Sequence, residues 1–270
     1  MPVPIFNGTL LVSDMDGTLL DSKSQVSREN QVALEYFVNH GGLFTIATGR
    51  MERTLRQYLP LLPINVPGIL YNGAVIYDFA TQKKLWEICL AEEIEQVIRD
   101  LITRFPGLGI EVFQGGEVFF LQQNHETEKH IAREGLFPQI TLIDRIPLPW
   151  IKVILVWEPE KLPAVESYLA VYRRFFRTVY SEPQFLEILP QEASKGHALQ
   201  KLVQLIGRED LKVVAMGDNL NDLEMIKMAD LGIAVANAHP GLKKAARFNY
   251  GHHDAHAVAE VVEHLKNKII

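Results

Sequence analysis

The run LLVSDMDGTLL, residues 10–20, is the part of the sequence that decides the fold. Its apolar start predicts a buried strand that ends in two carboxylates, Asp14 and Asp16, followed by a glycine turn. Ligands of open α/β sheets bind at the carboxyl ends of the strands, so both acids lie where chemistry is expected. Two like charges this close repel unless a cation or an anion-binding pocket accompanies them. By itself the motif also allows a polar turn with a local Asp cap.

The first third of the chain alternates predicted strands and helices around this run. A helix with Ser27 as its N-cap precedes a buried strand over residues 43–47, and a second helix runs to Leu59. A short strand over residues 69–71 follows. This β-α-β-α-β alternation predicts a parallel sheet with right-handed crossovers.

The last third returns to the same pattern, and the middle differs from both. The last third predicts, in order, a helix over 195–205, a strand over 211–216, a helix over 223–228, a strand over 231–235, and helices over 241–246 and 255–266. In the middle, strands over 111–114 and 117–122 flank Gly115-Gly116, a good hairpin turn. Further helices over 92–105, 126–134 and 162–174 and strands over 151–157 and 177–181 surround this hairpin.

We therefore expect a Rossmann-like α/β core with a parallel sheet, formed by residues 1–84 and 190–270. An α+β domain over residues 85–189 is expected to be inserted into that core, because hairpins mixed with helices differ from the alternation on either side.

Composition excludes several classes of function. The net charge is −6 and basic residues form no stripe, so nucleic acid is not an expected partner. Cys89 is the only cysteine, which excludes an intrachain disulfide and fits a reducing cytoplasm. The sequence shows neither a signal peptide nor an apolar run long enough for a membrane span. His252, His253 and His256 are interpreted as solvated surface rather than as a metal site.

Polar clusters mark four places at strand ends or helix starts of the predicted core. They are Asp14 with Asp16, Thr48-Gly49, Lys195, and the group Asp218, Asn221 and Asp222. Each cluster has a simple alternative, since Thr and Asp often cap helices and most lysines are solvated. Four unrelated caps and surface residues would not be expected to gather at one edge of a sheet. A shared site explains their common position better.

Phosphoryl transfer through an aspartyl phosphate is the chemistry that needs this set of groups. A carboxylate attacks phosphorus and divides one hard displacement into two easier ones. Because the carboxylate and the phosphate repel, a hard cation such as Mg²⁺ is needed, held by Asp oxygens and a carbonyl. A lysine, a hydroxyl and backbone N–H groups offset the remaining charge, and a second Asp handles the proton.

The chain resembles the haloacid dehalogenase superfamily in all four of its signature motifs. These are Asp14-x-Asp16-Gly17-Thr18, Thr48-Gly49-Arg50, Lys195, and Gly217-Asp218-x-x-Asn221-Asp222. The inserted domain is similar to that of subclass IIB. The segments Asn72-Gly73-Ala74, Leu186-Glu187-Ile188 and Ser194-Lys195-Gly196 are similar to the Cof-type phosphatases of that subclass. In that family the inserted domain is a cap that lines the leaving-group pocket.

The resemblance implies a role for each matching residue. Asp14 would be the nucleophile and a Mg²⁺ ligand, and Asp16 the general acid/base with its backbone carbonyl on the metal. Asp218 would be the remaining metal ligand. The phosphoryl oxygens would be held by Thr48, Lys195 and Asn221 and by backbone N–H groups of Met15 and Gly49. Asp222 would orient Lys195 or a metal-bound water. Asn72 is a candidate for substrate contact, with a simple turn residue as the alternative.

These roles predict a monomeric, cytoplasmic Mg²⁺-dependent phosphatase of small phosphorylated metabolites, such as sugar phosphates or pyridoxal phosphate. One alternative is a hexose phosphomutase of the same subclass, although the fourth motif here has the compact form of the hydrolases. Another is a phospho-signalling or metabolite-binding module without turnover. Receiver domains of that kind use Asp, Mg²⁺, Thr and Lys, but they are about half as long and lack an inserted cap.

Overall fold

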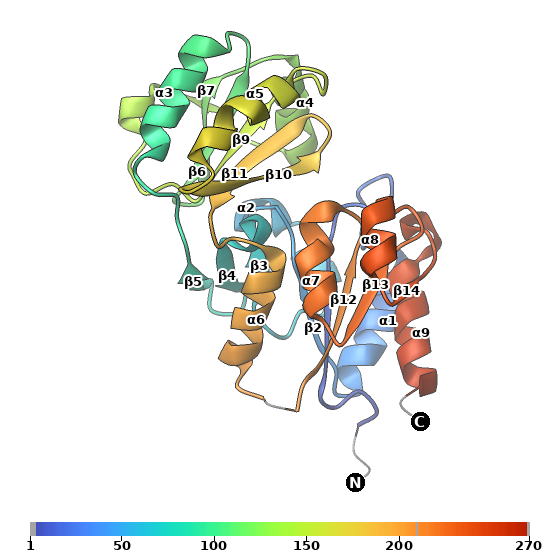
Figure 1. Ribbon diagram of the computed structural model, residues 1–270. Helices are drawn as coiled ribbons and strands as arrows, with labels where there is room; N and C mark the ends of the chain where they lie inside the picture. Colours follow the sequence, from blue (N-terminus) through green and yellow to red (C-terminus); the bar gives the residue numbers. More distant parts are fainter. Residues whose placement is uncertain (1–3, 209, 269–270) are drawn as a thin grey trace. The chain divides into compact units, whose positions relative to one another are not determined.

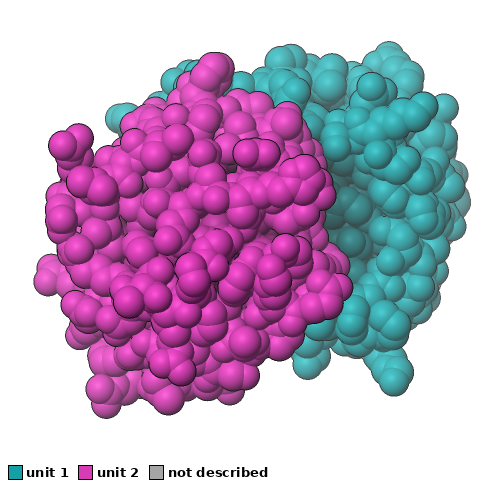
Figure 2. Space-filling view, turned by 90° about the horizontal axis from the view of Figure 1, so that it is seen from above, with its two compact units in different colours: residues 1–50, 55–86, 194–270 teal, residues 51–54, 87–193 magenta. Residues whose placement is uncertain are grey.

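The computed structural model describes residues 4–208 and 210–268 of the chain, which form two compact units (Figures 1 and 2). Unit 1 combines Met1–Arg50, Leu55–Trp86 and Ser194–Ile270, and unit 2 combines Met51–Thr54 with Glu87–Ala193. Unit 1 is thus assembled from both ends of the chain, whereas unit 2 is almost one continuous segment. The short segment Met51–Thr54, which groups with unit 2, was not expected from the sequence.

Unit 1 is built on a parallel five-stranded sheet, which confirms the expected α/β class. Its strands, in spatial order, are β14 (Phe248–Asn249), β13 (Leu231–Ala234), β12 (Lys212–Gly217), β1 (Thr9–Ser13) and β2 (Leu43–Ile46). All five residues of β1 are buried, and the apolar residues at its centre, Leu10, Leu11 and Val12, suit a strand that is paired on both sides. The carboxyl ends of β1 and β12 therefore lie side by side.

Helices connect and cover these strands. They are α1 (Arg28–Asn39), α6 (Lys195–Ile206), α7 (Leu223–Met228), α8 (Pro240–Ala245) and α9 (Ala257–Lys268), with 3₁₀ turns η1 (Leu59–Leu61), η2 (Tyr71–Gly73), η5 (Leu220–Asp222) and η6 (His253–Ala255). The short helix α2 (Glu52–Leu55) lies mostly in the segment that groups with unit 2. Helix α1 packs on α9, and α6 packs on α7 (Figure 1). The Ser27 side chain accepts a hydrogen bond from the Asn30 N–H at 3.2 Å, which confirms the predicted N-cap. The predicted second helix through Leu59 is wrong, since α2 ends at Leu55 and a separate 3₁₀ turn contains Pro60.

A small antiparallel sheet, β3 (Gly68–Leu70), β4 (Val75–Asp78) and β5 (Lys83–Glu87), completes unit 1. The prediction treated residues 69–71 as a strand of the parallel sheet. In the structure only a parallel bridge between Ala47 and Ile69 continues the parallel pattern into β3. Strand β4 begins with the buried residues Val75 and Ile76, whereas β5 is mostly exposed and lacked the apolar signal that identified the other strands.

Unit 2 contains a six-stranded sheet and three helices. The strands, in spatial order, are β10 (Phe176–Glu182), β11 (Phe185–Pro190), β9 (Lys152–Val156), β6 (Gly109–Gln114), β7 (Glu117–Gln122) and β8 (Gln139–Ile140). The helices are α3 (Ile94–Arg104), α4 (His125–Glu134) and α5 (Leu162–Leu169), with 3₁₀ turns η3 (Ile143–Arg145) and η4 (Ala170–Tyr172). The β6–β7 turn has two glycines with positive φ, 62° at Gly115 and 81° at Gly116, as a tight hairpin requires.

The two faces of the unit 2 sheet carry different side chains. One face packs against α3 and α5 through apolar residues such as Val112, Val153 and Leu186. Because side chains alternate along a strand, the neighbouring residues Glu111, Lys152 and Glu187 point to the opposite face.

Within residues 4–208 and 210–268, every helix is too short or too polar to cross a lipid bilayer.

Candidate active site

Strand β1 delivers Asp14 to the edge of the sheet. The Asp14 N–H donates to the carbonyl of Met216 at 3.0 Å, which extends the pairing between β1 and β12 by one residue. Asp14 is only 5% exposed. The carboxylate is therefore fixed at the strand end, next to the loop that follows β12.

Lys195, the first residue of α6, faces this carboxylate. Its Nζ lies 2.6 Å from Oδ1 of Asp14 and 2.6 Å from Oδ1 of Asp222, and its side chain is fully buried. Helix α6 can begin here because the Ser194 side chain caps it, accepting from the His197 N–H at 3.0 Å. A Cβ at Gly73, whose φ is +96°, would lie 2.1 Å from the Ser194 carbonyl oxygen. Only glycine lets the η2 turn approach the start of this helix so closely.

Asp222 holds both the lysine and its own loop. Its Oδ2 accepts hydrogen bonds from the N–H groups of Asp218 at 3.0 Å and Asn219 at 3.1 Å, while Oδ1 accepts from Lys195. Asp222 is completely buried, so these bonds satisfy an otherwise costly buried charge. Of the two roles expected for Asp222, this contact corresponds to the orientation of Lys195.

Asp218 reaches the loop that carries Asp14 and Asp16 because residue 17 is a glycine. Gly17 has a φ of +78°, and a Cβ there would lie 2.5 Å from Oδ2 of Asp218. Carboxylate oxygens of Asp14, Asp218 and Asp222 lie within 4.8 Å of one another. The structure thus brings the first and fourth motifs together around one point.

These groups carry more negative than positive charge. Burial raises the pKa of the Asp14 carboxyl well above its ordinary range, Lys195 opposes the rise, and the neighbouring carboxylates add to it. Burial also raises the pKa of Asp218 to about 7, with the charge of Asp222 as the next cause. Burial disfavours the charged form of Lys195, but Asp14 and Asp222 outweigh it, so the pKa of Lys195 lies above its ordinary value.

The donor set fits a hard divalent cation. Because Asp222 uses both oxygens for Lys195 and its own loop, Asp14 and Asp218 are the carboxylates suited to bind a metal. Carboxylate and carbonyl oxygens are the ligands that Mg²⁺ prefers, and a cation would offset the excess charge. These residues therefore fit Mg²⁺, with the Asp16 backbone carbonyl as the expected third ligand.

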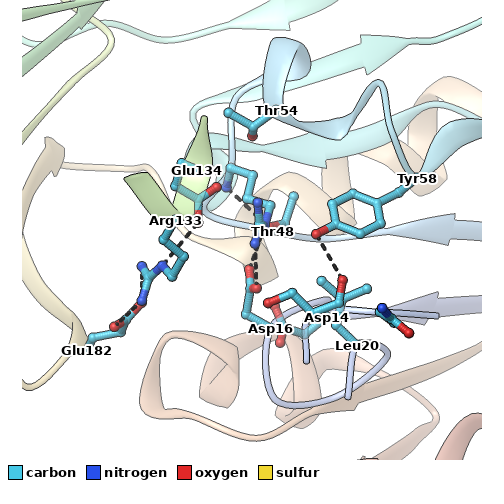
Figure 3. Close-up of polar contacts among 12 residues, drawn as sticks. Asp14, Asp16, Leu20, Thr48, Thr54, Tyr58, Arg133, Glu134 and Glu182 are labelled. Atoms are coloured by element: carbon cyan, nitrogen blue, oxygen red, sulfur yellow. Dashed lines mark hydrogen bonds and ion pairs between the residues drawn. The ribbon is translucent and has the colours of Figure 1, made fainter. Parts of the chain in front are cut away.

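The Asp16 side chain is held in an ion pair rather than directed at Lys195. Arg50 donates to it through Nε and Nη2, each at 2.8 Å from one carboxylate oxygen, and Figure 3 shows Asp16 on the same loop as Asp14. The Asp16 side chain is 52% exposed, whereas that of Arg50 is 7% exposed. The Arg50 guanidinium also lies 5.5 Å from the centre of the Tyr58 ring.

Four of the predicted phosphate- and substrate-binding residues meet beside this pair. The Asn221 side-chain amide donates to Oδ1 of Asn72 at 3.0 Å. A Cβ at Gly49 would lie 3.0 Å from the amide nitrogen of Asn72. The Thr48 hydroxyl accepts from the Arg50 N–H at 3.1 Å, and a hydroxyl that accepts one bond can still donate its proton. Asn72 has a φ of 55° in η2 and is 2% exposed, so it is both a turn residue and part of this group.

The remaining predicted residue, Met15, has a buried side chain, and its carbonyl accepts from the N–H groups of Leu19 and Leu20 at 3.0 and 2.9 Å. Met15 therefore shapes the loop that carries both aspartates.

The sequence alone did not identify two residues that shape the site. Arg50 was noted only as the end of a motif, although its position directly after Thr48-Gly49 was a usable signal. Asn237 joins the nucleophile loop to a distant turn: it donates to the Gly17 carbonyl at 2.7 Å and accepts from the His253 N–H at 3.2 Å. Its sequence surroundings give no signal for this contact.

Comparisons with known proteins agree with this geometry. The profile of the haloacid dehalogenase-like hydrolase family matches residues 11–262. The chain is 32% identical over 266 residues to YxeH of Bacillus subtilis (strain 168), named as a phosphatase candidate, covering 95% of this chain and 97% of that protein. It is 28% identical over 280 residues to the 5-amino-6-(5-phospho-D-ribitylamino)uracil phosphatase YwtE of the same organism, covering 93% and 96%.

A solved structure shows the same fold. A haloacid dehalogenase-like hydrolase from Bacteroides thetaiotaomicron matches with a TM-score of 0.85 and 30% identity, covering 96% of this chain and 99% of that one. The family match spans all four motifs, and the superfamily and Cof type expected from them are confirmed. The chain belongs to the haloacid dehalogenase-like hydrolases, as a member of the Cof type.

Proposed function

We propose that the protein is a Mg²⁺-dependent phosphatase that hydrolyses small phosphorylated metabolites through a phosphoaspartyl intermediate on Asp14. The observation that carries the proposal is the buried Asp14 carboxylate, which lies at the end of strand β1, 2.6 Å from the Lys195 ammonium. Buried, crowded and charge-compensated groups of this kind are typical of catalytic sites. When bound, Mg²⁺ supplies the positive charge that offsets the repulsion between this carboxylate and the phosphate.

The reaction then runs in two displacements. An Asp14 oxygen attacks phosphorus, the bond from phosphorus to the ester oxygen breaks, and Asp16 gives that oxygen a proton so that it leaves as an alcohol. In the second step Asp16 takes a proton from water as the water oxygen attacks phosphorus. The bond to Asp14 breaks, and inorganic phosphate leaves.

Lys195 and its neighbours have a positioning and electrostatic role in both steps. The Lys195 ammonium stabilises the nucleophilic carboxylate and is held at its place by Asp222. Side chains of Thr48 and Asn221 and backbone N–H groups of Met15 and Gly49 are proposed to bind the phosphoryl oxygens. Asn72, which accepts from Asn221, is proposed to orient that amide and contact the substrate.

Asp16 must leave its ion pair to act as the acid. Both of its oxygens accept hydrogen bonds from Arg50, which holds the carboxylate in the ion pair. We propose that the arrangement with Arg50 is the resting one and that Asp16 turns toward the leaving oxygen when substrate binds. Its half-exposed side chain supports such a movement.

Unit 2 is proposed to select the leaving group, as the inserted domain of the family does. The expected substrates are sugar phosphates and pyridoxal phosphate. The name of the relative YwtE adds a phosphorylated ribitylamino-uracil to the compounds that should be tested. The proposal also includes a monomeric state and a cytoplasmic location. The single cysteine supports a reducing compartment.

Phosphate release from a panel of these esters, measured with and without Mg²⁺, tests the proposal. We expect turnover that EDTA abolishes and Mg²⁺ restores. Isomerisation of a hexose phosphate would instead indicate a phosphomutase. A phosphoenzyme that persists for minutes without turnover would indicate a signalling or binding module.

The role of Asp16 has a sharper test. Asp16→Asn should slow the hydrolysis of alkyl phosphates about 10²- to 10⁴-fold, because an alkoxide needs a proton to leave. It should slow p-nitrophenyl phosphate far less, because that leaving group is stable as an anion. Asp78→Asn, in the turn after β4, is the matched control and should change neither rate. Equal losses on both substrates would argue against Asp16 as the acid.

A further inference from the structure

The turn η6 and the residue before it, which follow strand β14, form a second group of possible metal ligands. We call His252, His253 and Asp254 the His-Asp turn. A ligand atom from each lies within 4.8 Å of the others. Oδ2 of Asp254 is 3.5 Å from Nδ1 of His252 and 3.8 Å from Nε2 of His253.

Hydrogen bonds fix two of these three side chains. Nδ1 of His253 lies 2.8 Å from the Leu20 carbonyl oxygen and must carry the proton it donates, which leaves a lone pair on Nε2. A backbone carbonyl on the far nitrogen is the usual way in which proteins orient a histidine toward a metal. Oδ1 of Asp254 accepts from the Ser22 N–H at 2.7 Å, so Oδ2 is the oxygen turned toward the histidines.

The spacing of these atoms is close to that of ligands around one ion. Zn²⁺ binds imidazole nitrogen and carboxylate oxygen at about 2.0 to 2.2 Å, which separates tetrahedral ligands by about 3.3 to 3.6 Å. The separations of 3.5 and 3.8 Å between Asp254 and the two histidines are close to this range, and the two imidazoles have ligand atoms within 4.8 Å of each other. Side-chain exposures of 47% for His252 and 43% for Asp254 leave the site accessible to an ion and to water ligands.

We propose that the His-Asp turn binds one divalent transition metal ion, with Zn²⁺ as the best match to two imidazoles and a carboxylate. Mg²⁺ is disfavoured there, since it prefers oxygen ligands. To bind, Nδ1 of His252 gives up the 3.2 Å hydrogen bond that it accepts from the Asp254 N–H. The sequence suggested a solvated surface here, because it gives no sign of the contacts with Leu20 and Ser22 that order this turn.

The proposed ion would tie the C-terminal third to the segment that follows the nucleophile run. Leu20 and Ser22 anchor two of the ligand side chains, and the His253 N–H also donates to Asn237, which holds the Gly17 carbonyl. Binding to the folded chain alone stabilises it by mass action. Added Zn²⁺ should therefore raise the melting temperature of unit 1.

Calorimetric titration of Zn²⁺ into EDTA-treated protein in excess Mg²⁺ tests this proposal, because Mg²⁺ occupies the aspartate site. We expect one Zn²⁺ per chain, and at least tenfold weaker binding in His252→Ala and Asp254→Asn. His125→Ala, which removes an exposed histidine from unit 2, is the matched control and should bind as the wild type does. Binding should persist in Asp218→Asn, which lacks an aspartate of the other site.

A second probe, Co²⁺, distinguishes a variant that has lost its fold from one that has lost only a metal-binding side chain. Co²⁺ bound at the turn should give visible absorption bands that disappear in His252→Ala while circular dichroism stays unchanged. The His252 side chain accepts a hydrogen bond from the Asp254 N–H of its own turn, so this substitution should be tolerated by the rest of the fold. Absence of Zn²⁺ binding in the presence of Mg²⁺, or equal binding in His252→Ala and His125→Ala, would overturn the proposal.

Discussion

The two units of the molecule bury charged side chains in different proportions. In unit 1 a single ammonium, Lys195, faces Asp14 and Asp222, with Asp218 close by. In unit 2 each of the two buried glutamates lies beside a nitrogen-bearing side chain. Lys152 lies 3.0 Å from Glu187, and His130 lies 2.9 Å from Glu111.

The difference teaches how to separate a reactive site from a structural ion pair. A balanced buried pair satisfies itself, and its main effect is on stability and specificity of packing. Burial raises the pKa of Asp14 and Asp218, and the neighbouring carboxylates add to the rise, so a further cation would stabilise their charged forms. The buried carboxylates of unit 1 therefore have the properties of a reactive site, whereas the buried pairs of unit 2 have those of structural contacts.

The largest effect should come from Asp14→Asn. We expect phosphate release to fall by about 10⁴-fold or more, because the nucleophile is lost. In the metal-free protein the same change should raise the melting temperature by about 2 to 4 °C, since one crowded carboxylate is removed. Calorimetric scans with EDTA and with Mg²⁺ check the second expectation. A lower melting temperature in EDTA would contradict the charge imbalance that we assign to this site.

Lys152→Met should have the largest effect on stability in unit 2. It leaves the buried Glu187 carboxylate without its lysine, at a cost of about 3 to 5 kcal/mol in the free energy of unfolding. The double variant Lys152→Met with Glu187→Leu should recover most of that loss, because neither charge remains. Urea unfolding can be followed by tryptophan fluorescence, since Trp150 and Trp157 lie in unit 2. A double variant as unstable as the single one would show that the loss does not come from leaving Glu187 without a partner.

Arg50→Lys should have an intermediate effect on catalysis. Lysine keeps the charge but cannot donate through two nitrogens, so Asp16 is positioned less well. We expect kcat to fall about 10- to 100-fold on alkyl phosphates, with a smaller change in KM and a smaller loss on p-nitrophenyl phosphate. Arg56→Lys, an exposed neighbour, is the control. The same loss on both substrates would show that Arg50 acts elsewhere than on Asp16.

The smallest effect should come from Lys161→Ala. Its pair with Glu158 has a distance of 3.1 Å, but both side chains are about half exposed, at 51% and 50%. Solvent screening limits such pairs to less than about 1 kcal/mol in the free energy of unfolding. Urea unfolding followed by tryptophan fluorescence also measures the effect of Lys161→Ala on the free energy of unfolding. A loss comparable with that of Lys152→Met would mean that burial is not what separates the two pairs.

The sequence predicted the parallel core and the residues of the site because their signals are local. Buried strands appear as apolar runs, and Asp14, Lys195 and Asp218 each follow or begin an element that such runs define. Partners across long separations gave no comparable signal. The pairing of Asp16 with Arg50, or of Lys152 with Glu187, depends on where two side chains point in the folded chain.

The missed strands have a physical reason as well. Strand β11 alternates apolar residues with a buried Glu187, so its sequence resembled a partly exposed segment. Strand β5 is mostly exposed, although it contains Leu85 and Trp86. Apolar periodicity detects burial, and in these places burial and apolarity do not coincide.

The division of unit 1 between the two ends of the chain has a consequence for biosynthesis. Strand β1 lies between β2 and β12, yet β12 leaves the ribosome about two hundred residues after β1. The continuous segment Glu87–Ala193 can fold in the meantime, while the nascent β1–β2 pair waits with one edge open. Arrested nascent chains that end before β12 should therefore resist protease in unit 2 and be cut within the first 50 residues.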